Sequence, residues 1–173
     1  TIGSAFSDVI SKSNMTLSSV ELLNEESVPK DAAAIIINAP QKDFNKNDAQ
    51  KVIDYLQKGG KAIIVGMHSE TEMPNFASIL DTYGVSLTTG PIADNDAQHY
   101  YNMGGPLYLL PNVNSSSYTG SLSGGYVYLP ISLGINYPQN STTDDTESTE
   151  ESKTTYTSLL DTSDDAVAKN NPN

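Results

Sequence analysis

Two short apolar runs dominate the hydrophobic pattern of the chain. Residues 32–38 (AAAIIIN) and 61–66 (KAIIVG) are continuous rather than alternating, which is typical of β-strands that are covered on both faces. Between them, four apolar residues with helical spacing predict a helix with one apolar face: Ala49, Val52, Ile53 and Leu56. Asn45 is expected to cap this helix, and Gly59 to end it. A buried strand, a helix and a second buried strand predict parallel pairing through a right-handed crossover.

Similar but weaker patterns lie on both sides of this unit. They predict helices at residues 4–13 and 74–83, strands at residues 16–22 and 85–87, and short strands at residues 107–110 and 126–131. Up to residue 87 the order of elements is that of a doubly wound α/β domain.

Composition divides the chain into three segments. Residues 1–135 carry the predicted helices and strands, and we expect them to form an α/β sandwich domain. Residues 136–156 are acidic, rich in Ser and Thr and nearly devoid of apolar residues, which is typical of a solvated or disordered loop. Residues 157–173 regain apolar positions, so we expect a C-terminal segment with a short helix that packs back on the same domain.

The charge of the chain restricts its partners. Its formal net charge is −12, from 21 acidic residues against 9 basic ones, all of them Lys. Such a chain repels phosphate backbones, so no nucleic-acid partner is expected. The absence of Cys excludes disulfides, thiolate nucleophiles and iron–sulfur clusters. No run approaches the ~20 apolar residues needed to cross a bilayer.

Several short motifs follow one another along the chain. Residues 28–40 contain a P-x-D-A lead and a strand that ends in Ala-Pro, and residues 54–61 read D-Y-L-x-K-G-G-K. Residues 80–85 contain a Y-G helix end, and the run L-L-D-T-S follows at residues 159–163. In this order, over roughly residues 4–169, the series resembles the extracytoplasmic domain of GldG-like auxiliary proteins of ABC-type transport systems, named after a gliding-motility component.

The resemblance implies both a fold and a setting. The fold would be a flavodoxin-like or class I glutamine-amidotransferase-like three-layer sandwich with a mainly parallel central sheet. The N-terminal strand that family members carry before the first helix would be missing here. The domain would lie on the extracytoplasmic face of the cell membrane, with its membrane tether outside this fragment. Permease and ATPase subunits, or other membrane proteins, would be its partners.

A candidate ligand site lies at the carboxyl ends of the two predicted parallel strands, where open α/β sheets bind ligands. Asn38 and Gln41 follow the first strand, and His68, Ser69 and Glu70 follow the second. His68 with Glu70 could bind a small ligand or a metal, since a carboxylate orients an imidazole. The alternative is a solvated loop whose polar groups satisfy the strand ends.

The same loop is also the place for a nucleophile in an amidotransferase-like sheet. Residues 66–69 (GMHS) hold neither a Cys nor the G-x-S-x-G spacing of a nucleophile elbow, so no catalytic residue and no cofactor are expected.

Two further groups of residues stand out in the second half of the chain. Asp94, Asp96 and His99 could pair with His68 as a hard-metal cluster, or could be turn formers and a surface His; the spacing of a calcium loop is missing, so no metal site is predicted. Five tyrosines could stack on sugars or proteins, or could simply cover one side of a strand: Tyr100, Tyr101, Tyr108, Tyr126 and Tyr128.

Three functions are compatible with these features. The first is a non-catalytic extracytoplasmic domain of an ABC-type transport component that binds a partner subunit or a ligand. The second is a hydrolase or amidotransferase-like enzyme that uses the His68 loop. The third is a carbohydrate-binding module that uses the tyrosines.

Overall fold

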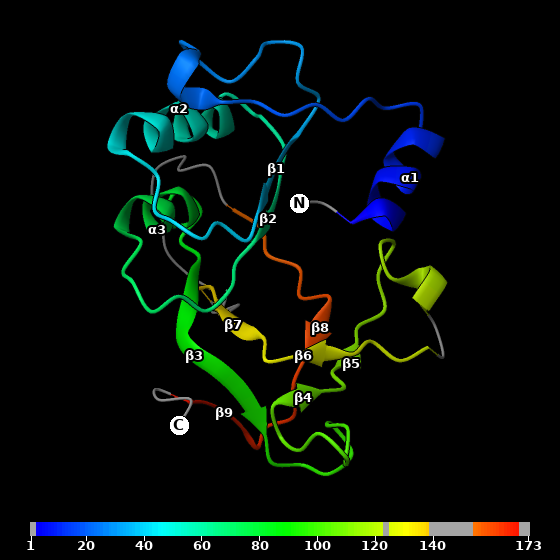
Figure 1. Cartoon of the computed structure of the whole chain (residues 1–173). Coiled ribbons are helices and arrows are strands. Elements are labelled where there is room, and N and C mark those ends of the chain that lie inside the picture. Colours follow the sequence, from blue (N-terminus) through cyan, green and yellow to red (C-terminus); the bar gives the residue numbers. More distant parts are fainter. Residues whose placement is uncertain (1–2, 123–124, 139–153, 170–173) are drawn as a thin grey trace, which may run out of the picture. The chain divides into compact units, whose positions relative to one another are not determined.

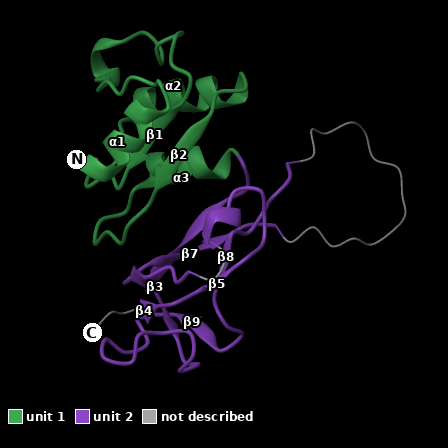
Figure 2. Cartoon of the chain, turned by 90° about the vertical axis from the view of Figure 1, so that its right-hand side faces the viewer, with its two compact units in different colours: residues 1–82 green, residues 83–173 purple. Residues whose placement is uncertain are grey.

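The structure is a computed structural model that describes residues 3–122, 125–138 and 154–169. The chain forms two compact units, residues 1–82 (unit 1) and residues 83–173 (unit 2), coloured separately in Figure 2. The division lies inside the segment 1–135 that the composition suggests as one domain. Within the described ranges, no helix combines the length and apolar character needed to cross a bilayer.

Unit 1 contains the α-helices of the described structure and its parallel strands (Figure 1). Its elements are α1 (Ser4–Lys12), the 3-10 turn η1 (Leu22–Asn24), β1 (Ile35–Asn38), α2 (Lys46–Gln57), β2 (Ala62–Val65) and α3 (Pro74–Asp81). β1 and β2 pair in parallel, with Ile35 opposite Ala62 and Asn38 opposite Val65. The predicted strand–helix–strand unit is therefore confirmed.

The helix between these strands forms as its sequence suggests. The Asn45 side chain accepts a hydrogen bond from the Asp48 backbone N–H at 2.9 Å, which satisfies one of the free donors of the first turn. Three residues of the apolar stripe of α2 are buried, Ala49, Val52 (1 % exposed) and Leu56, while Ile53 is half-buried. At its end Gly59 takes a φ of 89°, a left-handed conformation that glycine adopts without strain.

The core of unit 1 lies on one side of the β1–β2 pair. It is built from α2, α3, the buried side of β1 and the segment before it, and its members are Val28, Ile37, Ala49, Val52, Leu56, Phe76 and Ile79. Phe44 stacks on Phe76 with ring centroids 6.3 Å apart. In Figure 1, α2 and α3 lie on one side of the strand pair and α1 on the other.

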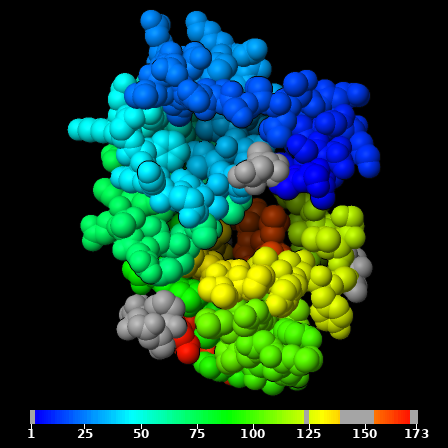
Figure 3. All heavy atoms as spheres, in the orientation of Figure 1, coloured from blue at the N-terminus to red at the C-terminus, as the bar shows by residue number. Residues whose placement is uncertain are grey.

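The opposite face of the strand pair is largely uncovered. Ile63 is 47 % exposed and Val65 44 % exposed. No residue of α1 is buried, and its side chains stand out in dark blue on the space-filling view (Figure 3). The sequence indicated strands covered on both faces, but the structure covers one.

Unit 2 is built from short strands that pair in antiparallel fashion. Its elements are β3 (Ser86–Asp94), β4 (Tyr108–Leu109), β5 (Asn112–Val113), the 3-10 turn η2 (Gly120–Leu122), β6 (Leu129–Pro130), β7 (Leu133–Asn136), β8 (Leu160–Asp161) and β9 (Ala166–Ala168). β3 lies between β7 and β9, while β4 pairs with β6 and β5 with β8.

The predicted fold class is wrong. Among the described residues β1–β2 is the single parallel pair, and there is no parallel central sheet of a flavodoxin-like or glutamine-amidotransferase-like sandwich. The strand expected at residues 85–87 as a further parallel strand is the start of the nine-residue β3. β3 instead pairs with two strands from later in the chain, and a register shift falls between Leu87 and Pro91. Apolar runs report burial, but they do not specify which strand becomes the neighbour.

Two other predicted elements also differ. Residues 16–22 form no strand. The helix expected within residues 157–168 is replaced by β8 and β9, because these residues pair with β5 and β3 and their backbone groups bond across the strands. Most of the acidic segment 136–156 (residues 139–153) lies outside the described residues.

Candidate functional site

The predicted ligand site at the carboxyl ends of β1 and β2 brings two loops together. The Ala39 N–H donates to the Val65 carbonyl at 2.8 Å, directly after the two strands. The Gln41 amide bridges the loops, because its Nε2 lies 3.2 Å from the Ala39 carbonyl and 2.7 Å from the sulfur of Met67. Ala39 has a φ of 47°, so the chain turns sharply after β1.

The polar residues after β2 do not assemble into a reactive group. The Ser69 hydroxyl donates to the Thr71 carbonyl at 2.9 Å and accepts from the Thr71 N–H at 3.2 Å. His68 is half-buried and Glu70 exposed, and no ion pair joins them in the part of the chain that is described. The ligand assignment of Asn38, Gln41, His68, Ser69 and Glu70 therefore stays a prediction.

Asp43, which the sequence did not single out, is the most connected side chain near this site. One carboxylate oxygen accepts from the Phe76 N–H at 2.8 Å, and the other accepts from the Asn75 N–H and from its side-chain amide. Burial raises the pKa of Asp43, but these hydrogen bonds outweigh it, so the pKa lies below the ordinary 3.8. Asp43 thus caps α3 from 32 residues away, a contact without a local sequence signal.

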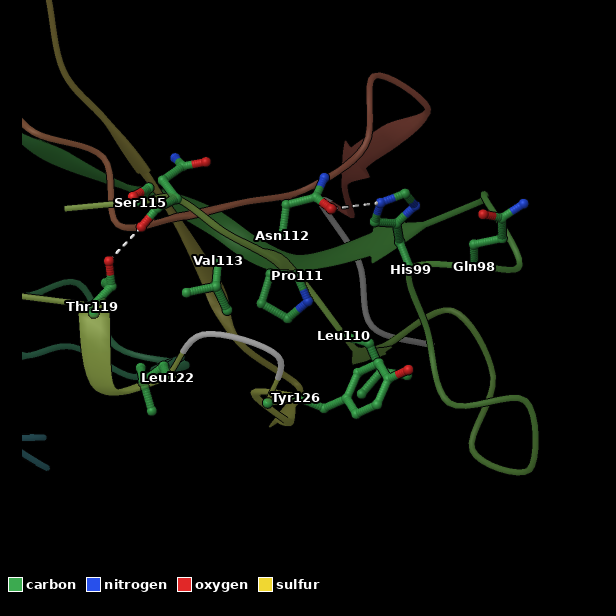
Figure 4. A pocket seen from close by; sticks show the side chains of 13 residues that line it. Gln98, His99, Leu110, Pro111, Asn112, Val113, Ser115, Thr119, Leu122 and Tyr126 are labelled. Carbon is green, nitrogen blue, oxygen red and sulfur yellow. Dashed lines mark hydrogen bonds between the residues drawn. The ribbon is translucent and has the colours of Figure 1, made fainter.

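Unit 2 contains a pocket of about 410 Å³ (Figure 4). It is lined by residues from the segment after β3, from β5 and from the segment around η2: Gln98, His99, Leu110, Pro111, Asn112, Val113, Asn114, Ser115, Thr119, Gly120, Leu122, Gly125 and Tyr126. None of these side chains is a carboxylate or an amine, so the lining is neutral apart from the imidazole. Its volume falls in the range of about 300–1,000 Å³ that is typical of small-molecule sites.

The imidazole of His99 has a polar side chain beside each ring nitrogen. Its Nε2 lies 3.2 Å from the side-chain oxygen of Asn112, and its Nδ1 lies 3.1 Å from a carboxylate oxygen of Asp96. The Nδ1 contact does not have the geometry of an aligned hydrogen bond, and it is an ion pair when the imidazole is protonated. Partial desolvation lowers the pKa of His99, but the contacts with Asn112 and Asp96 outweigh it and raise the pKa above 6.5.

Asp94 fixes the start of the loop that carries Asp96 and His99. It is completely buried at the end of β3, and its carboxylate accepts from the Asp96 N–H and from both the N–H and the hydroxyl of Ser163. Burial raises the pKa of Asp94, but the hydrogen bonds outweigh it and the pKa lies below 3.8.

These hydrogen bonds leave Asp94 poorly placed to bind a cation. Its oxygens are directed at protein N–H and O–H donors. Across the ranges given above, no group of three or more His, Asp or Glu side chains is arranged to hold a metal ion.

The structure separates the tyrosines into two environments. Tyr128 packs against Tyr101 edge to face and against Tyr108 in a stacked geometry, with ring centroids 6.2 Å apart in both pairs. Tyr126 makes no ring contact with another described aromatic side chain, is 90 % exposed, and stands at the pocket. The alternation of Tyr126 and Tyr128 suggested that both could cover one side of a strand. In the structure neither residue belongs to a strand, because β6 begins at Leu129.

No protein-family model matches this chain, and no curated protein or solved structure shows significant similarity to it.

Proposed function

We propose that this chain is a non-catalytic binding domain, with the pocket of unit 2 as its ligand site. The observation that carries the proposal is the pocket itself. It combines apolar side chains with amide and hydroxyl groups, and its one imidazole contacts Asn112 and Asp96. Polar groups at fixed positions in a cavity orient a small ligand, and the apolar side chains beside them provide the area that it buries.

The hydrogen bonds of Ser69, Thr119 and His99 favour binding over covalent chemistry. A nucleophile needs a base within hydrogen-bond reach, about 2.6–3.2 Å. The Thr119 hydroxyl in the pocket donates to the Asn114 carbonyl, and the Ser69 hydroxyl donates to Thr71. The His99 Nε2 faces the amide oxygen of Asn112 rather than a hydroxyl.

The ordered motifs between residues 28 and 163 support a place for this domain in an ABC-type transport system. Under this proposal the domain lies on the extracytoplasmic side of the membrane and is tethered by segments outside the sequence given. A permease and an ATPase would be its partner subunits. The strongly acidic charge agrees with a surface that avoids nucleic acid and anionic lipid. The support here is the motif series alone, since the fold that the resemblance implied is not observed.

A combined binding and turnover experiment tests the proposal. The whole chain is screened by thermal unfolding against neutral metabolites, oligosaccharides and uncharged peptides, and the same samples are assayed for hydrolysis of ester, amide and glutamine substrates. A binding domain should show at least one ligand that raises the unfolding temperature, because a ligand at 100 times its Kd stabilises by about 2.7 kcal/mol. Turnover that disappears in His68→Ala but persists in His99→Gln would replace the proposal with the enzyme that uses the His68 loop.

A further inference from the structure

The groups that unit 2 directs at its pocket define the chemistry of a ligand. Hydrogen-bonding amides come from Gln98 and Asn112, a hydroxyl from Ser115, and an aromatic ring from Tyr126. We propose that the pocket binds a neutral carbohydrate, with Tyr126 as the stacking platform and Asn112 as the main hydrogen-bonding residue. This inference rests on the proposed binding function and names its ligand class.

The electrostatics of the site favour an uncharged ligand. No Asp, Glu or Lys side chain lines the pocket, and the chain as a whole carries a net charge of −12. An anionic ligand would be repelled by this field and would find no Lys or Arg at the pocket to bind it. A cationic ligand would find no carboxylate among the lining residues. A neutral polyhydroxylated molecule is not repelled by the net charge and needs no charged partner in the pocket.

The ring of Tyr126 is exposed to solvent, and no other described aromatic ring packs against it. Its side chain is 90 % exposed, whereas Tyr128, two residues later, packs between two other rings. A tyrosine ring offers a large apolar face together with a polar hydroxyl. The C–H groups on one face of a pyranose ring match such a surface, so that stacking buries apolar area on both partners while the sugar hydroxyls stay at the rim.

The second element of recognition is the oriented amide of Asn112. Its oxygen is engaged by the His99 Nε2 at 3.2 Å, which fixes the plane of the amide. Its Nδ2, which can donate two hydrogen bonds, has no partner among the described residues. Sugar hydroxyls accept and donate in turn, so a fixed donor at this position selects their orientation.

The apolar side chains of the pocket complete the match. Leu110, Pro111 and Val113 lie between His99 and Asn112 on one side and Leu122 and Tyr126 on the other, as Figure 4 shows. Apolar side chains that lie among polar groups suit a ring that is apolar on its faces and polar at its rim. Every group in this argument lies in unit 2.

The test is affinity electrophoresis of the whole chain through gels that contain one neutral polysaccharide each (starch, mannan, xyloglucan, β-glucan), with polygalacturonate as the anionic counterpart. Candidate ligands are then titrated by calorimetry. Wild-type protein should be retarded by at least one neutral polysaccharide and not by polygalacturonate. Tyr126→Ala should weaken binding about tenfold, and Tyr126→Phe much less, since it keeps the ring.

Tyr118→Ala is the matched control, because Tyr118 is 79 % exposed but does not line the pocket. Asn112→Leu should also weaken binding, and thermal unfolding of each variant shows whether it remains folded. Equal binding by Tyr126→Ala and Tyr118→Ala would overturn the assignment of the site.

The outcomes also separate this inference from the function on which it rests. If an uncharged peptide binds and no carbohydrate does, the carbohydrate assignment fails while the binding domain stands. Retardation by polygalacturonate alone would overturn the neutral ligand class in the same way. If neither carbohydrates, peptides nor neutral metabolites bind, both the inference and the proposed function fail.

Discussion

The buried carboxylate of Asp94 accepts hydrogen bonds from both the backbone N–H and the hydroxyl of Ser163, which follows 69 residues later. Through this contact the end of β3 holds the turn between β8 and β9. A third hydrogen bond, from the Asp96 N–H, starts the loop that carries His99 to the pocket. One side chain thus joins the C-terminal strands to the proposed ligand site.

Replacing Asp94 should therefore destabilise unit 2 strongly. Asp94→Ala leaves two backbone N–H groups without their acceptor, and we expect the free energy of unfolding to fall by about 2–4 kcal/mol. Tyr55 is the one tyrosine of ten within residues 1–82, so tyrosine fluorescence during urea unfolding reports mainly on unit 2. Asp164→Ala, at an exposed neighbouring residue, is the control. A change below about 0.5 kcal/mol at Asp94 would contradict the role assigned to it.

Asp43 has the corresponding role in unit 1. Asp43→Ala removes the acceptor for the first N–H groups of α3, and we expect a loss of about 1–2 kcal/mol. The helices α1, α2 and α3 all lie in unit 1, so far-UV circular dichroism monitors this unit during unfolding. Asp31→Ala provides an exposed control within the same unit. Equal midpoints for the two variants would show that the capping contact contributes nothing.

Acid should weaken both units through the same two carboxylates. The pKa values of Asp43 and Asp94 lie below 3.8 in the folded chain. Their extra stabilisation is therefore fully present above the unfolded value and is lost as the pH falls through the folded value. Measured by urea unfolding, Asp43→Asn and Asp94→Asn should each flatten the acid limb of the stability curve. Limbs that superimpose on that of the wild type would exclude this linkage.

The sequence predicted the strand–helix–strand unit well because its signals are local. The cap at Asn45, the apolar stripe of α2 and the end at Gly59 all act within one or two helical turns. How many faces of the β1–β2 pair are covered does not depend on local sequence. Ile37 and Ile63 belong to similar apolar runs, yet Ile37 is 9 % exposed and Ile63 is 47 % exposed. A run of isoleucines indicates that burial is favourable. Which element covers each face of the strand depends on contacts with other parts of the chain.

This difference between the two isoleucines is directly measurable. Ile37→Ala removes a side chain packed in the core of unit 1, and we expect a loss of about 2–4 kcal/mol. Ile63→Ala, the same chemical change on the uncovered face, should cost less than about 1 kcal/mol. Both values come from urea unfolding followed by far-UV circular dichroism. Equal large losses would mean that another element covers the Ile63 face.

The candidate site was harder to predict than the elements for the same reason. Asp94, Asp96 and His99 attracted attention as possible cation ligands, but their partners are Ser163 and Asn112, which no spacing rule connects to them. Tyr126 and Tyr128 alternate as strand residues do, and only the packing of Tyr128 against other rings distinguishes them. The role of a polar residue depends on the groups that it contacts, and here these groups lie far away in the sequence.

The imidazole of His99 makes the stability of unit 2 depend on pH near neutrality. Its pKa in the folded chain lies above 6.5, mainly through Asn112 and Asp96 against the opposing effect of desolvation. A raised pKa means that the extra stabilisation is fully present below the unfolded value and is lost as the pH rises through the folded value. Tyrosine fluorescence should therefore report a decline in the free energy of unfolding as the pH rises above the ordinary histidine pKa of about 6.5. Asp96→Asn should reduce this decline, and Asp164→Asn, at an exposed residue without a contact to His99, should preserve it. If both variants show the slope of the wild type, the charge contact between His99 and Asp96 does not contribute to folding, and His99 reaches the pocket without its support.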